Sequence, residues 1–266
     1  MVLRINPEPT LENVGGKGLQ LFKLMKICNV PDFFVICLDD VSEIDRLDVQ
    51  NDILKYFDEK DFSQVAVRSS ATAEDSSSAS FAGMFETELN VMKDNLIIAI
   101  KKVLASASED RVREYCSLNH YDYKSVQMRV VVQNMVNSRV SGVCFTKESK
   151  NTNVMLIEGC YGLGELLVSG VVTPDTYKVD RDSFEIVSQC IGYQKNMFES
   201  GGTNELIPVP FHRRNAKKLT DKEIKELAQV CVHIEKVLGY YSADIEWTFS
   251  EDKLYMLQVR PFVGIQ

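Results

Sequence analysis

The chain has 266 residues, 45% of them hydrophobic, which is enough to bury a substantial core as one large domain or two lobes. Its formal net charge of −8 argues against a nucleic-acid groove as the main function, because such grooves hold phosphates with clustered Lys and Arg. The N-terminus lacks the pattern of a signal peptide, and no apolar run reaches the roughly 18 residues that cross a bilayer, so we expect a soluble cytoplasmic protein.

The seven cysteines are scattered along the chain, without a CxxC pair and with mostly apolar neighbours. Reduced, buried thiols are therefore expected, rather than disulfides or zinc ligands.

A glycine-rich motif, VGGKG, occupies residues 14–18 and precedes apolar residues that recur at helical spacing. The pattern predicts a helix that starts near Lys17. A lysine at a helix N-terminus is electrostatically costly unless an anion joins it, because that end already carries partial positive charge. Lys17 is therefore a candidate anion ligand, and a solvated lysine after a glycine turn is the alternative. Residues 29–38 then suit a central strand, and the charged residues 39–61 are predicted to be helical.

The stretch from Val65 to Asn90 reads VAVRSSATAEDSSSASFAGMFETELN. Its apolar start predicts a buried strand that delivers Arg68 to the edge of a sheet. The small residues that follow, including Gly83, let backbone N–H groups approach an anion, and the Arg68 guanidinium offers a fork of donors to phosphate oxygens. We interpret the stretch as a phosphate-binding loop; a mobile surface loop is the alternative.

The middle of the chain is predicted to alternate strands and helices. Residues 86–91 form a second strand, and residues 94–115 form one helix that backs the sheet. SVQMRVVVQ, residues 125–133, is a strand rich in β-branched residues and leads into NMVNSRVSGVCFT. On periodicity alone, Met135 in that segment is an ordinary core residue.

Four glycines surround Glu165 in GCYGLGELLVSGVVTPD, residues 159–175, which indicates a flexible element able to close over a ligand. A hairpin is predicted over residues 176–191, with its turn at residues 180–183, and a long loop over residues 194–215. Thr220 and Glu223 form a capping box for a helix that ends at Gly239.

Residues 243–262, ADIEWTFSEDKLYMLQVRPF, predict two strands joined at residues 250–253. This pairing brings Glu246 and Gln258 close together, with Arg260 on the same face. A carboxylate and an amide oxygen are hard ligands that suit magnesium, which keeps phosphate oxygens and waters in the rest of its octahedron. A surface hairpin with an ion pair between Glu246 and Arg260 is the alternative.

Several of these motifs occur together in one known family. RSSATAED, ASFAG and ET, followed by DIEW and LYMLQVRP, resemble the ATP-binding domain of the phosphoenolpyruvate synthase and pyruvate phosphate dikinase family. That family also includes rifamycin phosphotransferases, glucan dikinases and a glutamine kinase. The resemblance spans nearly the whole chain, although relatives have more residues before Arg68 and commonly a Trp at the position of Tyr161. It implies an α+β fold of the ATP-grasp type with mixed or antiparallel sheets, in which ATP lies between lobes of about residues 1–122 and 123–266.

The resemblance also implies roles for individual residues. Lys17, Arg68 and Arg260 would act on the phosphates, and Gly83 and Thr87 of the loop would bind the nucleotide. Glu165 would be a ribose ligand, and Gln133, Met135 and Val136 would lie against adenine. Glu246 and Gln258 would hold Mg²⁺. For Glu165, a solvated glutamate is nearly as good an interpretation.

The function that the resemblance implies is to bind MgATP and to supply its β-phosphate to a catalytic histidine on a separate swivelling domain. AMP and phosphate would be released, and a third domain would bind the final acceptor, such as pyruvate, glutamine or a rifamycin. The histidines of this chain, His120, His212 and His233, lack the Gly/Thr-rich context of that phosphoryl carrier. We therefore expect both further domains elsewhere, on the same full-length chain or on a separate subunit.

Two rival functions stay open at this point. One is an ATP-grasp ligase that forms an acyl phosphate and releases ADP. The other is a nucleotide-binding subunit without chemistry of its own.

Overall fold

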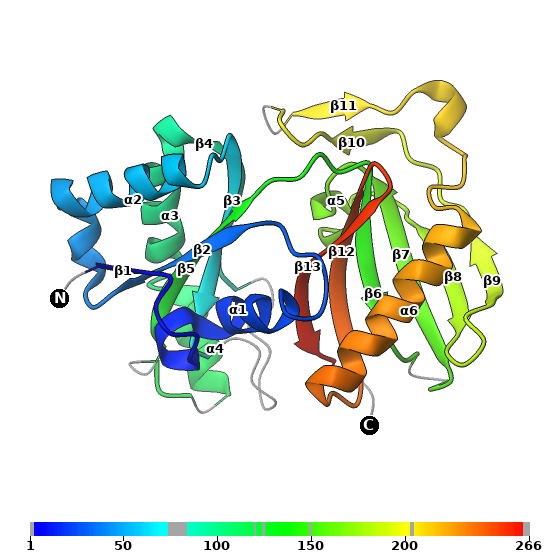
Figure 1. The fold of residues 1–266 in the computed structure, drawn as a ribbon, viewed down its shortest axis with the longest axis horizontal. Coiled ribbons are helices and arrows are strands. Elements are labelled where there is room, and N and C mark those ends of the chain that lie inside the picture. Colours follow the sequence, from blue (N-terminus) through cyan, green and yellow to red (C-terminus); the bar gives the residue numbers. More distant parts are fainter. Residues whose placement is uncertain are drawn as a thin grey trace. The chain divides into compact units, whose positions relative to one another are not determined.

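The structure is a computed structural model that describes residues 3–73, 84–119, 121–123, 126–148, 151–202 and 205–262. The chain divides into two compact units (Figure 1). Unit 1 comprises Met1–Phe22 and Pro31–Met135, and unit 2 comprises Lys23–Val30 and Val136–Gln266. The strand that ends at Asn134 belongs to unit 1, because it pairs there with strands on both sides.

Unit 1 contains a five-stranded antiparallel sheet in the order β1-β2-β5-β3-β4. Its strands are short and, except at the edges, almost wholly buried, as the apolar runs of the sequence predict. Their bounds are β1 (Leu3–Ile5), β2 (Phe33–Leu38), β3 (Gln64–Ala71), β4 (Thr87–Met92) and β5 (Met128–Asn134). β3 lies between β5 and β4; β4 pairs with it as far as Arg68, and beyond that point Ser70 and Ala71 pair with β5.

Helices cover both faces of this sheet. On one face, α2, α3 and α4 contribute buried apolar residues to a core that includes Phe34 of β2. Phe33 alternates with Phe34 along the strand and packs against Phe22 of α1, with ring centroids 5.0 Å apart, so α1 lies on the opposite face. The helix bounds are α1 (Leu11–Leu24), α2 (Leu47–Glu59), α3 (Leu96–Ser106) and α4 (Asp110–Leu118), with 3₁₀ turns at Val41–Asp45 and Lys93–Asn95.

The prediction of one helix over residues 94–115 is wrong, because the chain breaks between α3 and α4. The N–H groups of Ala107, Ser108 and Glu109 each donate to the carbonyl three residues earlier, a 3₁₀ pattern that tightens and ends α3. The apolar pattern continues through the break, since both helices bury residues in the same core.

Unit 2 contains a six-stranded antiparallel sheet in the order β13-β12-β6-β7-β8-β9. The α+β class with antiparallel sheets is therefore confirmed. The long strands are β6 (Val140–Phe145), β7 (Val154–Tyr161), β8 (Asp175–Asp180), β9 (Ile186–Cys190), β12 (Ala243–Ser250) and β13 (Lys253–Pro261). The smaller elements are α5 (Glu165–Val168), a hairpin of β10 (Asn196–Phe198) and β11 (Leu206–Pro208), and a 3₁₀ turn at Phe211–Arg213.

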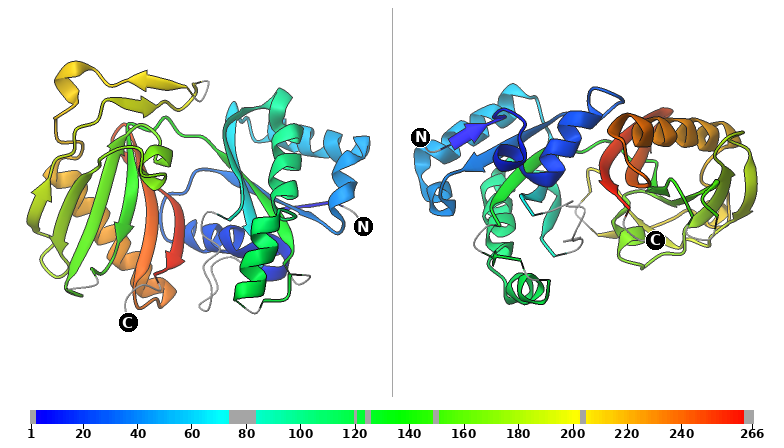
Figure 2. Two further views of the ribbon diagram at one scale, coloured as in Figure 1. Left: turned by 180° about the vertical axis from the view of Figure 1, so that it is seen from behind. Right: turned by 90° about the horizontal axis from the view of Figure 1, so that it is seen from below.

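One face of this sheet packs against α6 (Asp221–Leu238), and the view from behind in Figure 2 shows the other face. The predicted ends of α6 are confirmed. Thr220 and Glu223 form a reciprocal capping box, and Gly239 caps the last turn with φ 71°. Within the described part of the chain, no helix is both long and apolar enough to span a membrane.

Trp247 fills the centre of the core under α6 and is fully buried. It lies over Gly142 and Gly159, which face each other on β6 and β7. A Cβ at Gly142 would lie 2.7 Å from the Trp247 ring, which leaves no room for a side chain, and one at Gly159 would lie 3.2 Å from it, a tight contact. The indole therefore anchors β12 and, with it, the neighbouring Glu246.

Candidate functional site

The Gly-Gly-Lys-Gly segment lies within α1, at a kink. Gly15 has φ 69° and ψ −178°, a backbone conformation that only glycine adopts readily, and it separates two helical pieces. The helix therefore begins at Leu11, earlier than predicted, and Lys17 stands near the start of the second piece. Its ammonium nitrogen lies 3.2 Å from Ser69 Oγ, so the segment meets the end of β3.

Arg68 of β3 lies beside two other predicted site residues, Gln133 and Thr87. Its side chain is 9% exposed, and Nη1 donates to Oε1 of Gln133 at 3.0 Å. Thr87, the exposed first residue of β4, is the direct cross-strand partner of Arg68. The structure thus brings together Lys17, Ser69, Arg68, Thr87 and Gln133 within unit 1. The predicted loop residue Gly83 lies outside the described residues.

Gln133, a predicted neighbour of adenine, has its amide oxygen engaged by Arg68. The side chain is 3% exposed, and its Nε2 has no hydrogen-bond partner among the described residues. A buried, unpaired amide donor costs about 1–3 kcal/mol. That donor is therefore suited to an acceptor that a bound ligand brings.

Met135 and Val136 lie in the segment that joins β5 to β6, and both are partly buried. The Met135 N–H donates to the carbonyl of Gln64 at 3.0 Å, which holds the start of this segment against β3. The division between the two units falls between these two residues.

Glu246 and Gln258 are direct partners across β12 and β13, as predicted. A β-bulge follows Glu246, so the register shifts just beyond the pair. Gln258 is buried and Glu246 is partly buried. One carboxylate and one amide side chain therefore project from the same face of the sheet, next to each other.

Asp244 is a residue of this site that the sequence reasoning missed. Arg260 contacts it through two nitrogens, with Nε 2.8 Å and Nη2 2.7 Å from Oδ2. Burial raises the pKa of the Asp244 carboxyl and the Glu246 charge adds to this, while Arg260 opposes it. The alternation of Asp244 and Glu246 along β12 was the available signal, since both carboxylates share a face with Arg260.

Glu158 belongs to the same face of unit 2. Direct cross-strand pairs run from Gln258 through Glu246 and Val143 to Glu158, on four adjacent strands. Burial raises the pKa of the Glu158 carboxyl above its ordinary value of 4.5. This face therefore carries two partly buried glutamates, of which the sequence reasoning identified only Glu246.

The predicted ribose ligand Glu165 is exposed and stands at the start of α5. The segment that contains it ends at Asp175, which is fully buried and bonded on both carboxylate oxygens. Oδ1 accepts from Lys218 Nζ at 2.5 Å and from Gly192 N at 2.9 Å, and Oδ2 accepts from Tyr177 Oη at 2.6 Å and Lys218 N at 2.8 Å. This network fixes one end of the glycine-rich segment.

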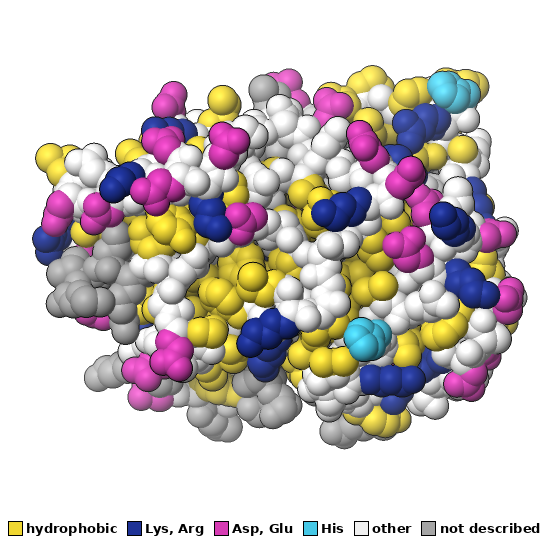
Figure 3. Space-filling view, in the orientation of Figure 1, with side chains coloured by type: hydrophobic (Ala, Val, Ile, Leu, Met, Phe, Trp, Pro, Cys, Tyr) yellow, Lys and Arg dark blue, Asp and Glu magenta, His cyan; other side chains and the backbone are white. Residues whose placement is uncertain are grey.

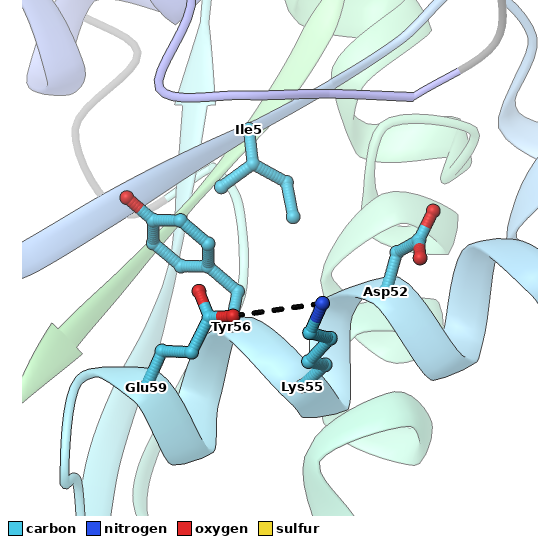
Figure 4. A pocket seen from close by; sticks show the side chains of 5 residues that line it. All are labelled: Ile5, Asp52, Lys55, Tyr56 and Glu59. Atoms are coloured by element: carbon cyan, nitrogen blue, oxygen red, sulfur yellow. Dashed lines mark ion pairs between the residues drawn. The ribbon is translucent and has the colours of Figure 1, made fainter.

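A pocket of about 240 Å³ lies elsewhere on unit 1, beside α2 (Figure 4). None of its lining residues is a predicted site residue; they are Ile5, Asp52, Lys55, Tyr56 and Glu59. Lys55 and Glu59 form an ion pair of 3.7 Å across one turn of the helix, and Tyr56 accepts a hydrogen bond from Asn6. The pocket therefore contributes nothing to the site described above.

Residues 45–265 match the protein family described as "Pyruvate phosphate dikinase, AMP/ATP-binding domain". The chain belongs to this family. The match takes in Arg68, Glu246 and Gln258 but begins after Lys17. Membership agrees with the expected nucleotide-binding domain.

Curated relatives extend the similarity. The chain is 40% identical over 207 residues to a "Probable phosphoenolpyruvate synthase" of Methanocaldococcus jannaschii, covering 76% of this chain and 17% of the relative. It is 41% identical over 206 residues to the "Rifampicin phosphotransferase" of Bacillus cereus, covering 75% and 23%. The "Uncharacterized phosphotransferase YvkC" of Bacillus subtilis is 34% identical over 293 residues, covering 99% and 35%, so its similarity includes the Lys17 segment.

The chain thus spans between 17% and 35% of the length of these relatives. Among solved structures, it is similar to D-alanyl-alanine synthetase A of Vibrio cholerae, with a TM-score of 0.40 and 12% identity over 93% of this chain and 58% of that one.

Proposed function

We propose that the chain binds MgATP and supplies its β-phosphate to a catalytic histidine on a separate domain, with release of AMP and phosphate. The final acceptor would be a small molecule bound by a further domain, of the class of pyruvate, glutamine or a rifamycin. The observation that carries this proposal is the contact of Lys17 with Ser69, next to Arg68, in a chain of the AMP/ATP-binding family.

The phosphates would be bound by Lys17 and Arg68 of unit 1. The Lys17 ammonium, next to Ser69, and the guanidinium of the preceding residue, Arg68, would supply the charge and the donors that a polyphosphate requires. Arg260 would add a third cation, which Asp244 orients through two contacts. Since phosphoryl transfer needs little covalent help, these groups would act by positioning and charge neutralisation.

Magnesium would be held by Glu246 and Gln258. Among the described residues, no group of three or more His, Cys, Asp or Glu side chains is arranged to hold a metal ion. Two oxygen ligands fit Mg²⁺, which usually takes one or two protein ligands and completes its shell with phosphate oxygens and waters. The ion would supply electrostatic stabilisation of the phosphate charge.

The base and the sugar of the nucleotide would be contacted by both polar and apolar side chains. The unpaired Nε2 of Gln133 would donate to the nucleotide, and Met135 and Val136 would lie against the adenine ring. Thr87 and Glu165, which are both exposed, would contact the nucleotide from β4 and from the start of α5.

The partner that completes the reaction would be a phosphohistidine domain, on the same full-length chain or on another subunit, in the cytoplasm. Two histidines of this chain, His212 and His233, are exposed. His120 lies outside the described residues. On the face drawn in Figure 3, acidic and basic side chains are interspersed, which suits a small ligand and a protein partner better than a nucleic acid.

The test is a product assay with ATP and magnesium, on this chain alone and after addition of the histidine domain. We expect AMP to appear only with the histidine domain. ADP would identify a ligase instead, and binding without any product would identify a non-catalytic subunit. Stoichiometric, acid-labile phosphohistidine on this chain alone would show that one of its own histidines is the acceptor.

A further inference from the structure

Ser70 makes an unusual pair of hydrogen bonds with α1. Its hydroxyl accepts from the N–H of Gly18 at 2.9 Å and donates to the carbonyl of Val14 at 2.6 Å. Val14 and Gly18 are four residues apart, so these are the acceptor and the donor that one α-helical hydrogen bond joins. The Ser70 side chain is fully buried. A side chain from β3 is therefore inserted into the hydrogen-bond ladder of the helix, where the helix is kinked.

The glycines of the segment make room for this insertion. A Cβ on Gly15 would lie 1.9 Å from the Ser70 carbonyl oxygen and 2.5 Å from Ser70 Oγ. The neighbouring strand adds a second link, because Arg129 is the cross-strand partner of Ser70 and its Nε donates to the carbonyl of Glu12 at 2.9 Å. The first turns of α1 are thus tied to β3 and β5 by adjacent buried side chains.

Lys17 lies within the span that Ser70 bridges, and its ammonium nitrogen is 3.2 Å from the hydroxyl of the preceding serine, Ser69. A lysine side chain carries about 2 kcal/mol of rotamer entropy, part of which is lost when it binds a ligand. A backbone that is already fixed leaves less to be ordered on binding. The tie between Ser70 and α1 therefore acts on the residue that would meet the phosphates.

We propose that Ser70 is a positioning residue for nucleotide phosphates: its hydroxyl holds the kink of α1 so that Lys17 points at them. This inference rests on the proposed function, since it assigns to Ser70 an effect that passes through Lys17. It predicts that the loss of the Ser70 hydroxyl weakens binding of ATP and leaves binding of adenosine, which lacks phosphates, unchanged.

The test is a double-mutant cycle of Ser70→Ala, Lys17→Ala and the double variant, with ATP and adenosine as calorimetric ligands. We expect Ser70→Ala to weaken ATP binding by about fivefold or more, which is the size of coupling seen between residues in contact. The double variant should bind ATP no more weakly than Lys17→Ala alone, because Ser70 acts on ATP binding only through the Lys17 side chain, which that variant lacks.

Ser106 provides a matched control for the loss of a buried serine in unit 1. Its hydroxyl donates to the Val103 carbonyl at 2.7 Å and accepts from the Glu86 N–H at 3.3 Å, the same bonding pattern as Ser70. Ser106→Ala should lower thermal stability without changing the ratio of ATP to adenosine affinity. Ser70→Cys, which keeps the size of the side chain, provides a folded variant if Ser70→Ala unfolds, and it should show the same selective loss for ATP.

The outcomes separate this inference from the proposed function. The inference would be overturned if the fold losses in ATP affinity of Ser70→Ala and Lys17→Ala multiply in the double variant. It would also be overturned if Ser70→Ala weakens the binding of ATP and of adenosine equally. If Lys17→Ala binds ATP as tightly as the unmodified chain, the phosphate role of Lys17 fails, and the inference fails with it. A loss of affinity that is confined to ATP and does not grow in the double variant supports both the role of Ser70 and the phosphate role of Lys17.

Discussion

Replacing Gly15 with alanine should disrupt the Gly-Gly-Lys-Gly segment more than replacing any exposed glycine. With φ 69° and ψ −178°, Gly15 occupies a region where a non-glycine residue costs on the order of 1–3 kcal/mol. The added Cβ would lie 1.9 Å from the Ser70 carbonyl oxygen, a backbone atom that cannot rotate away. The resulting shift would break both hydrogen bonds of the Ser70 hydroxyl, at about 1 kcal/mol each. The expected loss of local stability is therefore about 3–5 kcal/mol.

Gly239→Ala is the matched control for this prediction. Gly239 caps α6 with φ 71°, but a Cβ there would meet no atom within 4 Å. Its replacement should cost only the backbone term, roughly 1–2 kcal/mol. Native-state hydrogen exchange measures both losses, on the amides of α1 and β3 for Gly15→Ala and on those of α6 for Gly239→Ala. If Gly15→Ala loses no more than Gly239→Ala, the close contact with Ser70 is not a feature of the protein in solution.

Other predictions concern ligand binding and pH. Lys17→Ala and Arg68→Ala should each weaken ATP binding by about 1.5–3 kcal/mol while adenosine binding is retained, and equal losses in calorimetry would refute the phosphate role. Glu246→Ala should reduce the stimulation of ATP binding by magnesium. Asp252→Ala, which removes an exposed carboxylate from the β12–β13 turn, is the control and should leave this stimulation unchanged. Unchanged stimulation in Glu246→Ala would show that Glu246 has a structural role only. Burial raises the pKa of Glu158 above 4.5, so this carboxyl keeps its proton to a higher pH in the folded chain than in the unfolded chain. The free energy of unfolding of the unmodified chain, relative to that of Glu158→Gln, should therefore fall as the pH rises from about 4.5 through the folded pKa. Stability curves that stay parallel over that range in urea unfolding would contradict this assignment.

The sequence predicted best those features that local chemistry determines. The ends of α6 follow from Thr220, Glu223 and Gly239 because capping involves residues within one turn of each other. The short turn of the hairpin brings Glu246 close to Gln258, but their direct pairing also requires the one-residue register shift between Glu246 and Trp247. In both cases the interacting groups are close in the sequence.

Features that depend on contacts distant in the sequence were not predictable in the same way. Arg68 and Gln133 are 65 residues apart, and only the order of strands in the sheet brings them together. Ser70 and Gly18 are 52 residues apart, and no spacing rule connects a strand serine to a helix backbone. Asp244 is a different case, because it and Arg260 belong to one hairpin and the alternation along β12 was a signal for it that the sequence reasoning overlooked.

The central claim, that this chain binds MgATP, is tested most directly by calorimetric titration of the chain with ATP in the presence and in the absence of magnesium. The account predicts saturable binding of ATP that magnesium strengthens. Failure to bind ATP, or an affinity that magnesium leaves unchanged, would contradict it.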